Sequence, residues 1–566
     1  MKPAAGFSLL LVFCALILAY ARLFFGFDVT DEAYFSTTAS LSSLGGLPFV
    51  NDSYFQQTAA LVMEPLVYLY RSVFESFGLI LFVRHLFFFL GLTCAYGIFR
   101  VLRIFLSWDL ALVIAILPAI YIPYPGPTLS YNATSSLLFM LGASLTIEGL
   151  LRQKFWIVGT GAFVLALGSF AHPLFGLAGV LVYLTLLKIF WQNRRLLFKG
   201  ASVGLVCYLS FWSITIARVG LDPIINAIQM SQLYGSGKAS GFAFKWRYFL
   251  STWADLGPPW WTWIIAGVSL AIILARKWSW TWIVPIVAGV FIFTLPEPLS
   301  YQGSPVLYMT PGLMVFLFVF SWLALPWSGF RGETQVNHLC IGMVAVGFLL
   351  GIMAFINSAT QLMAVPLGLQ FGFIFLFARA ATIRSRVAIL VPLLFFYGAI
   401  HYYGYQFSYR EGSIGSLNTW MTKGPFAGLR TGAFKAEYFE LVEEDLRKAS
   451  EGASTLLVYD NFPAGYLMAK LRPATHAIFI HPLPYGYLDR QVHTEYYRED
   501  RSRWPDVILQ MELFPYDENQ YSMNRTEWTK PPHDSFFDYL PTSGEYQMVV
   551  QREMGAYVFY RIWRRR

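Results

Sequence analysis

The sequence has little charge and very few cysteines or histidines. Only 13% of its 566 residues are charged, whereas 56% are hydrophobic and 18% are aromatic, a balance far from that of soluble domains. The four cysteines all lie in apolar segments, which is typical of small buried side chains and not of a disulfide framework or a metal site. This composition excludes an ordinary soluble protein and indicates a polytopic membrane protein.

Long apolar runs recur along the first 400 residues. The first, 7–27, has about the 20 residues that a spanning helix needs, and it lacks a small-residue cleavage site before the acidic residues that follow. We therefore expect a retained first span and about thirteen transmembrane helices in all. The further expected spans are 79–105, 108–122, 134–151, 155–170, 174–190, 201–217, 259–274, 281–295, 306–327, 339–356, 362–377 and 387–400.

The distribution of basic residues predicts the orientation of the chain. The net charge of +8 comes mostly from short loops between apolar segments, so nucleic-acid binding is not expected. Arg100, Arg152 and Arg194 mark basic loops on alternate connections, which are cytoplasmic by the positive-inside rule. We therefore expect a multi-pass protein of the cytoplasmic (inner) membrane with its N-terminus in the cytoplasm. The outer face then carries the loops 28–78 and 220–258 and a periplasmic, extracytoplasmic C-terminal domain.

The chain divides into a transmembrane module, 1–402, and an α/β domain, 403–566. From about residue 401 the hydrophobicity falls and the charge rises, and the remaining length suffices for one domain. Periodicity predicts a helix at 436–451 and strands at 455–459, 477–480, 506–510, 546–551 and 556–562. The outer segment 28–78 is too polar to cross and rich in aromatics, so we expect amphipathic pieces lying on the membrane.

Three carboxylates follow the first span within five positions: Asp28, Asp31 and Glu32. Carboxylates are costly in hydrocarbon, so this cluster must lie in water, in a cavity or at the start of a helix. One interpretation is a site at the membrane surface. The other is that the cluster caps and charges the first turn of a helix, where the helix dipole favours anions.

Three features of the first hundred residues together resemble a known family. They are Asp31-Glu32-Ala33-Tyr34-Phe35, the patch Glu64-Pro65-Leu66-Val67-Tyr68 and Arg84 at the start of the second span. The chain resembles the C-type glycosyltransferase (GT-C) superfamily, and within it the protein O-mannosyltransferases and the lipid A aminoarabinose transferases. The resemblance implies a GT-C fold and a polyprenyl-phosphate sugar donor used outside the cytoplasmic membrane. It departs from the aminoarabinose transferases at Tyr34, where they have an arginine, and at Met63-Glu64-Pro65, which lacks their lysine.

Sugar transfer from a lipid phosphate requires a base for the acceptor hydroxyl and cations for the leaving phosphate. We expect Asp31 to be the base, with Glu32 orienting the acceptor or substituting as base. The candidates for donor binding are Tyr34, Arg84, His172, Lys238, Lys245 and Arg247. Two alternatives stay open: His172 lies in water at a helix end, and the basic residues of the loop anchor lipid headgroups.

Asp28, Glu64 and Asn132 are candidates for acceptor or auxiliary roles. Glu64 has the further alternatives of binding a cation or of pairing with Arg71 or Arg84, and Asn132 that of capping a helix. No spaced metal set is evident, so no cofactor is expected, although a divalent cation stays open.

The sequence predicts an inverting glycosyltransferase whose acceptor is a lipid, a polysaccharide or a protein. The alternatives are a flippase or transporter of lipid-linked saccharide, and an oligosaccharide ligase that uses a diphosphate-linked donor.

Overall fold

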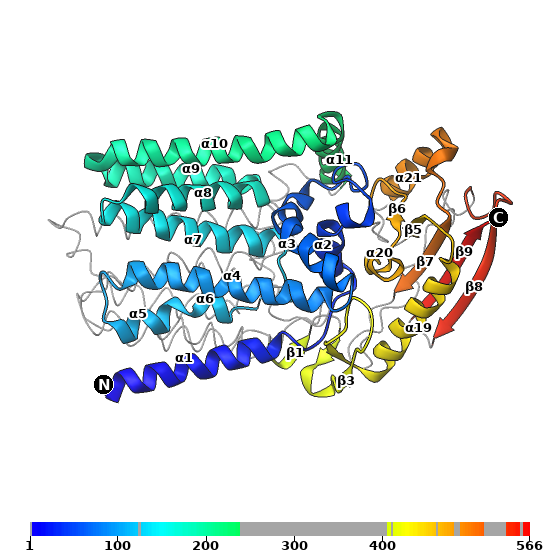
Figure 1. Cartoon of the computed structure of the whole chain (residues 1–566), viewed down its shortest axis with the longest axis horizontal. Helices are drawn as coiled ribbons and strands as arrows, with labels where there is room; N and C mark the ends of the chain where they lie inside the picture. Colours follow the sequence, from blue (N-terminus) through cyan, green and yellow to red (C-terminus); the bar gives the residue numbers. More distant parts are fainter. Residues whose placement is uncertain are drawn as a thin grey trace, which may run out of the picture.

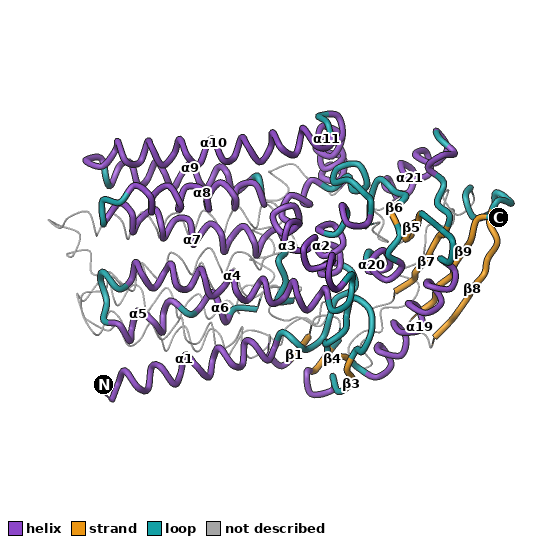
Figure 2. Tube along the Cα trace, in the orientation of Figure 1, coloured by secondary structure: helices purple, strands orange, loops and turns teal. Residues whose placement is uncertain are grey.

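The computed structural model describes residues 3–122, 126–237, 405–408, 411–459, 462–479, 487–513, 539–554 and 558–566. A bundle of apolar helices adjoins a smaller domain built on a β-sheet, and Figure 1 shows the N-terminus at the end of the bundle far from that domain. In Figure 2 the helices fill the bundle and the strands gather at the other end of the molecule. The predicted order of a helical region followed by an α/β domain is therefore confirmed.

The helices of the bundle follow the predicted apolar stretches. The second expected span, for example, is α4 (Leu79–Leu102). Within 108–122 the helix breaks into α5 and α6 beside Pro118, which has no backbone N–H to continue the hydrogen-bond ladder. The other helices are α1 (Pro3–Arg22), α5 (Trp108–Ala115), α6 (Leu117–Ile120), α7 (Tyr131–Leu151), α8 (Phe155–Ala171), α9 (Leu174–Ile189), the 3-10 turn η3 (Trp191–Asn193) and α10 (Arg194–Val219).

Three helical stretches of the described residues are long and apolar enough to cross a membrane: Leu79–Leu102, Tyr131–Leu151 and Trp191–Val219. The α4–α5, α7–α8 and α9–α10 connections, which carry the basic residues, lie at the same end of the bundle as the N-terminus (Figure 1). The expected spans from 259 to 400 lie outside the described residues, so the total of about thirteen and the orientation in the membrane stay predictions.

Glycines allow α7 and α8 to pack closely. A Cβ on Gly161 would lie 2.6 Å from the backbone nitrogen of Thr146, and one on Gly142 would lie 2.8 Å from the carbonyl oxygen of Gly161. Small residues are the usual means by which membrane helices approach one another. At the outer end of this pair the rings of Tyr131 and His172 have centroids 5.2 Å apart.

The outer segment 28–78 folds into α2 (Asp31–Ala39), η1 (Ser42–Leu44), η2 (Phe55–Gln57) and α3 (Thr58–Phe74). The predicted amphipathic character holds for α3, which buries Met63 and Val67 and exposes the apolar Leu69 and Val73. It is wrong for α2, because every residue from 32 to 39 is buried. This short helix lies between the bundle and the C-terminal domain (Figure 1).

The C-terminal domain has a mixed five-stranded sheet in the order β6-β5-β7-β9-β8. β5 pairs in parallel with β6 and β7, whereas β9 is antiparallel to β7 and β8. The helix α19 contacts β8, β9 and α20. The bounds are α19 (Ala433–Ala449), β5 (Thr455–Tyr459), α20 (Ala464–Ala469), β6 (Arg472–Pro473), α21 (Tyr487–Glu499), η7 (Arg501–Arg503), β7 (Val507–Leu513), β8 (Tyr546–Met554) and β9 (Val558–Arg565).

The helix and four of the five predicted strands of this domain are confirmed, and the strand at 477–480 is wrong. Residues 477–479 are irregular, because the Thr475 hydroxyl accepts from the backbone N–H of Ala477 at 3.0 Å and donates to its carbonyl at 2.7 Å. A side chain that satisfies backbone groups in this way competes with strand pairing.

A small irregular region joins the bundle to this domain. It contains η5 (Ile414–Ser416) and the short paired strands β1 (Phe407–Ser408), β2 (Gly412–Ser413), β3 (Thr419–Trp420) and β4 (Arg430–Thr431). On the other side of the molecule, the stretch expected as a loop at 220–258 begins instead as α11 (Asp222–Gly237). The rest of that stretch lies outside the described residues.

Candidate active site

The two aspartates at the start of α2 occupy different environments. Asp28 is buried, and its Oδ2 accepts hydrogen bonds from the backbone N–H groups of Asp31 at 2.6 Å and Glu32 at 3.3 Å. Asp28 therefore caps the helix, as the alternative interpretation of this cluster expected. Asp31 is the first residue of α2 and is half-buried, and the positive end of the helix dipole there favours a carboxylate.

Glu32 and Arg84 form a buried ion pair. Nε of Arg84 donates to Oε1 of Glu32 at 2.6 Å, and Nη2 donates to Oε2 at 2.8 Å, so the pair is bidentate. The remaining N–H groups of Arg84 donate to the carbonyls of Leu23 at 2.6 Å, Gly26 at 2.6 Å and Phe25 at 3.3 Å. Only 1% of Glu32 and 2% of Arg84 is exposed. The structure thus joins Glu32, a predicted catalytic residue, to Arg84, a predicted donor-binding residue. The pair attaches residues 23–32 to the start of α4.

Tyr34 contacts a buried aspartate that the sequence prediction passed over. Its hydroxyl donates to Oδ2 of Asp52 at 2.7 Å, and the backbone N–H of Tyr54 donates to Oδ1 at 3.3 Å. Burial raises the pKa of Asp52 to about 7, although hydrogen bonds from Tyr34, Tyr54 and Thr38 favour its ionised form. Burial and the nearby carboxylate raise the pKa of Tyr34 as well. Within the described residues Asp52 forms no ion pair with a lysine or arginine.

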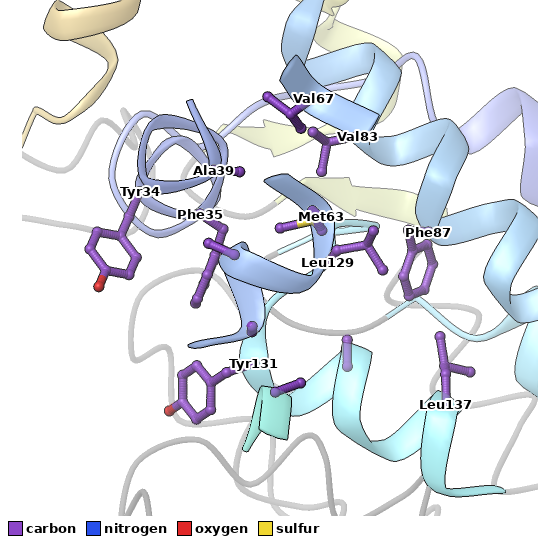
Figure 3. Close-up of a cluster of buried hydrophobic side chains, with 14 of the residues drawn as sticks. Tyr34, Phe35, Ala39, Met63, Val67, Val83, Phe87, Leu129, Tyr131 and Leu137 are labelled. Carbon is purple, nitrogen blue, oxygen red and sulfur yellow. The ribbon is translucent and has the colours of Figure 1, made fainter. Parts of the chain in front are cut away.

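The start of α7 lies beside one face of α2. Phe35 packs on Tyr131 with ring centroids 5.8 Å apart, and Figure 3 shows the hydroxyls of Tyr34 and Tyr131 directed to the same side, away from Met63 and Leu129. Asp31 is one helical turn before Phe35, so the two share a face of α2. This places the predicted base on the face that looks toward the start of α7.

His172 directly follows α8 and is buried. Its ring packs between Tyr131 and Phe175, with centroid distances of 5.2 and 5.0 Å. The alternative in which His172 lies in water at a helix end is therefore wrong. Asn132 is also buried, in the first turn of α7. It is not the cap of that helix, because the Ser130 hydroxyl accepts from the backbone N–H of Ala133 at 3.2 Å.

Glu64 pairs with an arginine that the sequence prediction did not name. Nη1 and Nη2 of Arg218 each donate to a different carboxylate oxygen of Glu64 at 2.7 Å, and the Ser42 hydroxyl also contacts Glu64. The expected pairing with Arg71 or Arg84 is wrong. Arg71 instead donates to the carbonyl of Ser40 at 3.2 Å, and it also contacts serine hydroxyls. Glu64 therefore joins α3 to α10.

The other predicted basic contacts, Lys238, Lys245 and Arg247, lie outside the described residues. In the part of the chain that the structure describes, no three histidine, cysteine, aspartate or glutamate side chains are grouped so that they could hold a metal ion. A role for a divalent cation stays a prediction of the sequence.

Sequence reasoning missed four residues around this site: Arg22, Asp52, Glu411 and Lys435. Nη1 of Arg22 donates to the Phe25 carbonyl at 2.6 Å. A signal existed for this arginine, because it is the only charged residue in α1 and ionisable residues of such helices are functional candidates. No signal existed for Glu411 and Lys435, which contact Phe27 from 384 and 408 positions away in the sequence.

No family model matches the chain, and no curated protein matches it. Among solved structures, it is similar to the oligosaccharyltransferase of Archaeoglobus fulgidus in the apo form, with 10% identity and a TM-score of 0.44 over 88% of this chain and 69% of that one. It is also similar to that enzyme tethered with an acceptor peptide (11% identity, TM-score 0.43, 89% and 69% covered). A third similar structure is AglB of the same organism with an inhibitory peptide and a dolichol-phosphate (11%, 0.44, 89% and 69%). The roles proposed below rest on this chain's own residues and not on these similarities.

Proposed function

We propose that the protein is a membrane-embedded inverting glycosyltransferase, which moves a sugar from a polyprenyl-phosphate donor to an acceptor outside the cytoplasmic membrane. The observation that carries the proposal is the setting of Asp31. This aspartate begins a helix at the outer end of the bundle, its backbone N–H is held by Asp28 at 2.6 Å, and the next residue is fixed by Arg84 at 2.6 Å. A base held by fixed neighbours is what transfer between two bound substrates requires.

In the proposed reaction the Asp31 carboxylate takes the proton of an acceptor hydroxyl while that oxygen attacks the anomeric carbon of the sugar. The bond from the anomeric carbon to the phosphate oxygen breaks, and its electron pair leaves with the lipid phosphate. Because the attack comes from the face opposite the phosphate, the configuration at the anomeric carbon inverts. The start of α2 favours the ionised form of Asp31 before the reaction.

The other residues take supporting parts in this proposal. Asp28, Glu32 and Arg84 hold the start of α2 in place through the hydrogen bonds described above. His172 and Asn132, buried at the outer ends of α8 and α7, are proposed to contact the donor beside the face that carries Asp31. We propose Lys238, Lys245 and Arg247 as cations for the leaving phosphate, as the sequence predicts.

The test is an assay of purified protein in detergent with polyprenyl-phosphate monosaccharides and a diphosphate-linked oligosaccharide as donors. We expect transfer or hydrolysis of a monophosphate donor, and Asp31→Asn should lower it about 10²- to 10⁴-fold, because a general base contributes that much. The matched control is Asp109→Asn, a half-buried aspartate in the first turn of α5, which should keep full activity. Equal turnover by wild type and Asp31→Asn would remove Asp31 from the role of base.

The same preparation decides between the proposal and its alternatives. Consumption of the diphosphate-linked donor alone would assign an oligosaccharide ligase. Movement of a lipid-linked saccharide across vesicles without transfer would assign a flippase. Adding a chelator to the transfer assay tests the open role of a divalent cation.

A further inference from the structure

Two charged side chains that follow the bundle in sequence bind both backbone polar groups of Phe27: Glu411 of the joining region and Lys435 of α19. Oε1 of Glu411 accepts from the Phe27 N–H at 2.6 Å and from Nζ of Lys435 at 2.5 Å, and Lys435 also donates to the Phe27 carbonyl at 2.6 Å. The second carboxylate oxygen, Oε2, accepts from the Thr431 hydroxyl at 2.7 Å. Glu411 is buried, so these charge-assisted hydrogen bonds are strong and little screened by solvent.

The side chain of Phe27 is held as firmly as its backbone. Its ring stacks on Phe426 with centroids 4.1 Å apart and packs edge-on against Phe439 at 5.6 Å. Nζ of Lys435 lies 4.0 Å from the centroid of the same ring, within the range of a cation–π contact. Phe27 therefore has little freedom to shift relative to the C-terminal domain.

The residues before Phe27 are held from two sides. On one side, Gly26 donates to the Arg430 carbonyl at 2.8 Å, and Arg430 donates to the Phe24 carbonyl at 2.7 Å. On the other side, Arg84 donates to the carbonyls of this segment, as described above. The close approach requires a glycine at 26, whose φ is +64° and where a Cβ would lie 1.7 Å from the Ser408 hydroxyl oxygen.

We infer that Glu411 and Lys435 are positioning residues for the proposed base, acting through Phe27 and Asp28. Phe27 directly precedes Asp28, and Asp28 holds the backbone N–H of Asp31 at 2.6 Å. A shift of Phe27 therefore moves the cap of α2 and with it the Asp31 carboxylate. This inference rests on the proposed function, and it gives Glu411 and Lys435 a part in catalysis through the position of Asp31.

The kinetic test uses Glu411→Gln, Lys435→Met and the double variant in the full-length protein. We expect each single change to lower kcat about 10- to 100-fold, because small misplacements of reacting groups cost that much, with KM for the donor nearly unchanged. The double variant should lose no more than the worse single one, since the two side chains act as a unit. The control is Asp445→Asn in the same domain, which removes a buried partner of Arg552 and Tyr560 and should lower stability without lowering kcat. Unchanged kcat in both single variants would overturn the inference.

A second readout does not depend on activity. Hydrogen exchange of the peptide 24–32 should become faster in Glu411→Gln and stay unchanged in Asp445→Asn. If exchange rises while Asp31→Asn keeps full activity, the proposed function fails and the structural coupling stands. If Asp31→Asn is inactive while Glu411→Gln changes neither exchange nor kcat, this inference fails and the proposed function stands.

Discussion

Two buried glutamates lie at opposite ends of α4, and each pairs with an arginine of that helix. At the end of α4 near the C-terminal domain, here called the outer end, Glu32 pairs with Arg84, whose side chain is 2% exposed. At the other end Glu148 pairs with Arg100 at 2.7 Å and with Arg152 at 2.9 Å, whose side chains are 28% and 47% exposed. Both carboxylates are equally buried, so the difference between the two ends lies in the cations.

This difference indicates different purposes for the two pairs. Removing both partners of an ion pair from water carries a large desolvation cost, which only close geometry and further hydrogen bonds can offset. Arg84 meets that condition with two bonds to Glu32 and three to carbonyls. The arginines of Glu148 keep part of their hydration, because their side chains are 28% and 47% exposed. The outer pair is thus built to fix the chain around the proposed site, and the inner pair mainly neutralises a buried carboxylate.

The largest effect is expected for Arg84→Gln. The change leaves Glu32 buried without its cation and removes a donor from the carbonyls of Leu23 and Gly26, so the free energy of unfolding should fall by about 3–5 kcal/mol. Transfer activity should be lost as well, because the segment before Asp31 loses its attachment to α4. Unfolding in detergent, followed by a tertiary-structure probe, measures the change. A loss below about 1 kcal/mol would show that the Glu32–Arg84 pair is no stronger than a surface pair. The two ends of α4 would then not differ in the strength of their ion pairs.

Asp52 is another buried carboxylate, and among the described residues it pairs with no arginine. Its pKa is raised to about 7 by burial, above the value of about 4 expected for the unfolded chain. The folded state then binds more protons than the unfolded state between these two values. Stability from Asp52 is therefore present at low pH and is lost as pH rises from about 4 to about 7, by up to about 1.4 kcal/mol per pH unit.

The test of this prediction is the difference in unfolding free energy between wild type and Asp52→Asn at pH 5 and pH 8. The variant must be compared with wild type at each pH because two histidines also make stability depend on pH. Burial lowers the pKa of His476 to about 4 and that of His493 well below its usual value. These histidines contribute a loss of stability as pH falls below about 6.5, which is the opposite sign. The free energy of unfolding of Asp52→Asn minus that of wild type should be larger at pH 8 than at pH 5. An equal difference at both values would contradict a raised pKa for Asp52.

Much of the fold could be predicted from the sequence because it depends on local pattern. Long apolar runs located α4 and α7 through α10, and short apolar runs located β5 and β7. The predicted strand at 477–480 failed because a single side chain, Thr475, satisfies the local backbone, which no hydrophobic pattern reveals. The burial of α2 was missed because it depends on the C-terminal domain, where the carbonyl of Pro463 accepts from the Thr37 hydroxyl at 3.0 Å.

The candidate site was predictable in its residue types and not in its pairings. Three carboxylates at the end of an apolar run single out the start of α2, and Arg84 was expected to lie near them. That Arg84 would bind Glu32, 52 positions away, or that Glu411 would bind Phe27, 384 positions away, is set by tertiary packing alone. Pairings of this kind leave no periodic signal, so a single sequence cannot show them.

The smallest effect is expected for Arg152→Gln at the inner end. Arg152 is half-exposed and lies one turn after Glu148, and Arg100 still holds the carboxylate at 2.7 Å when Arg152 is removed. The free energy of unfolding should therefore fall by no more than about 1 kcal/mol, as for exposed pairs. Measured in the same detergent as Arg84→Gln, this variant provides the reference for the outer pair. Equal losses in the two variants would mean that burial of the arginine does not set the strength of these pairs, and the distinction between the two ends of α4 would not hold.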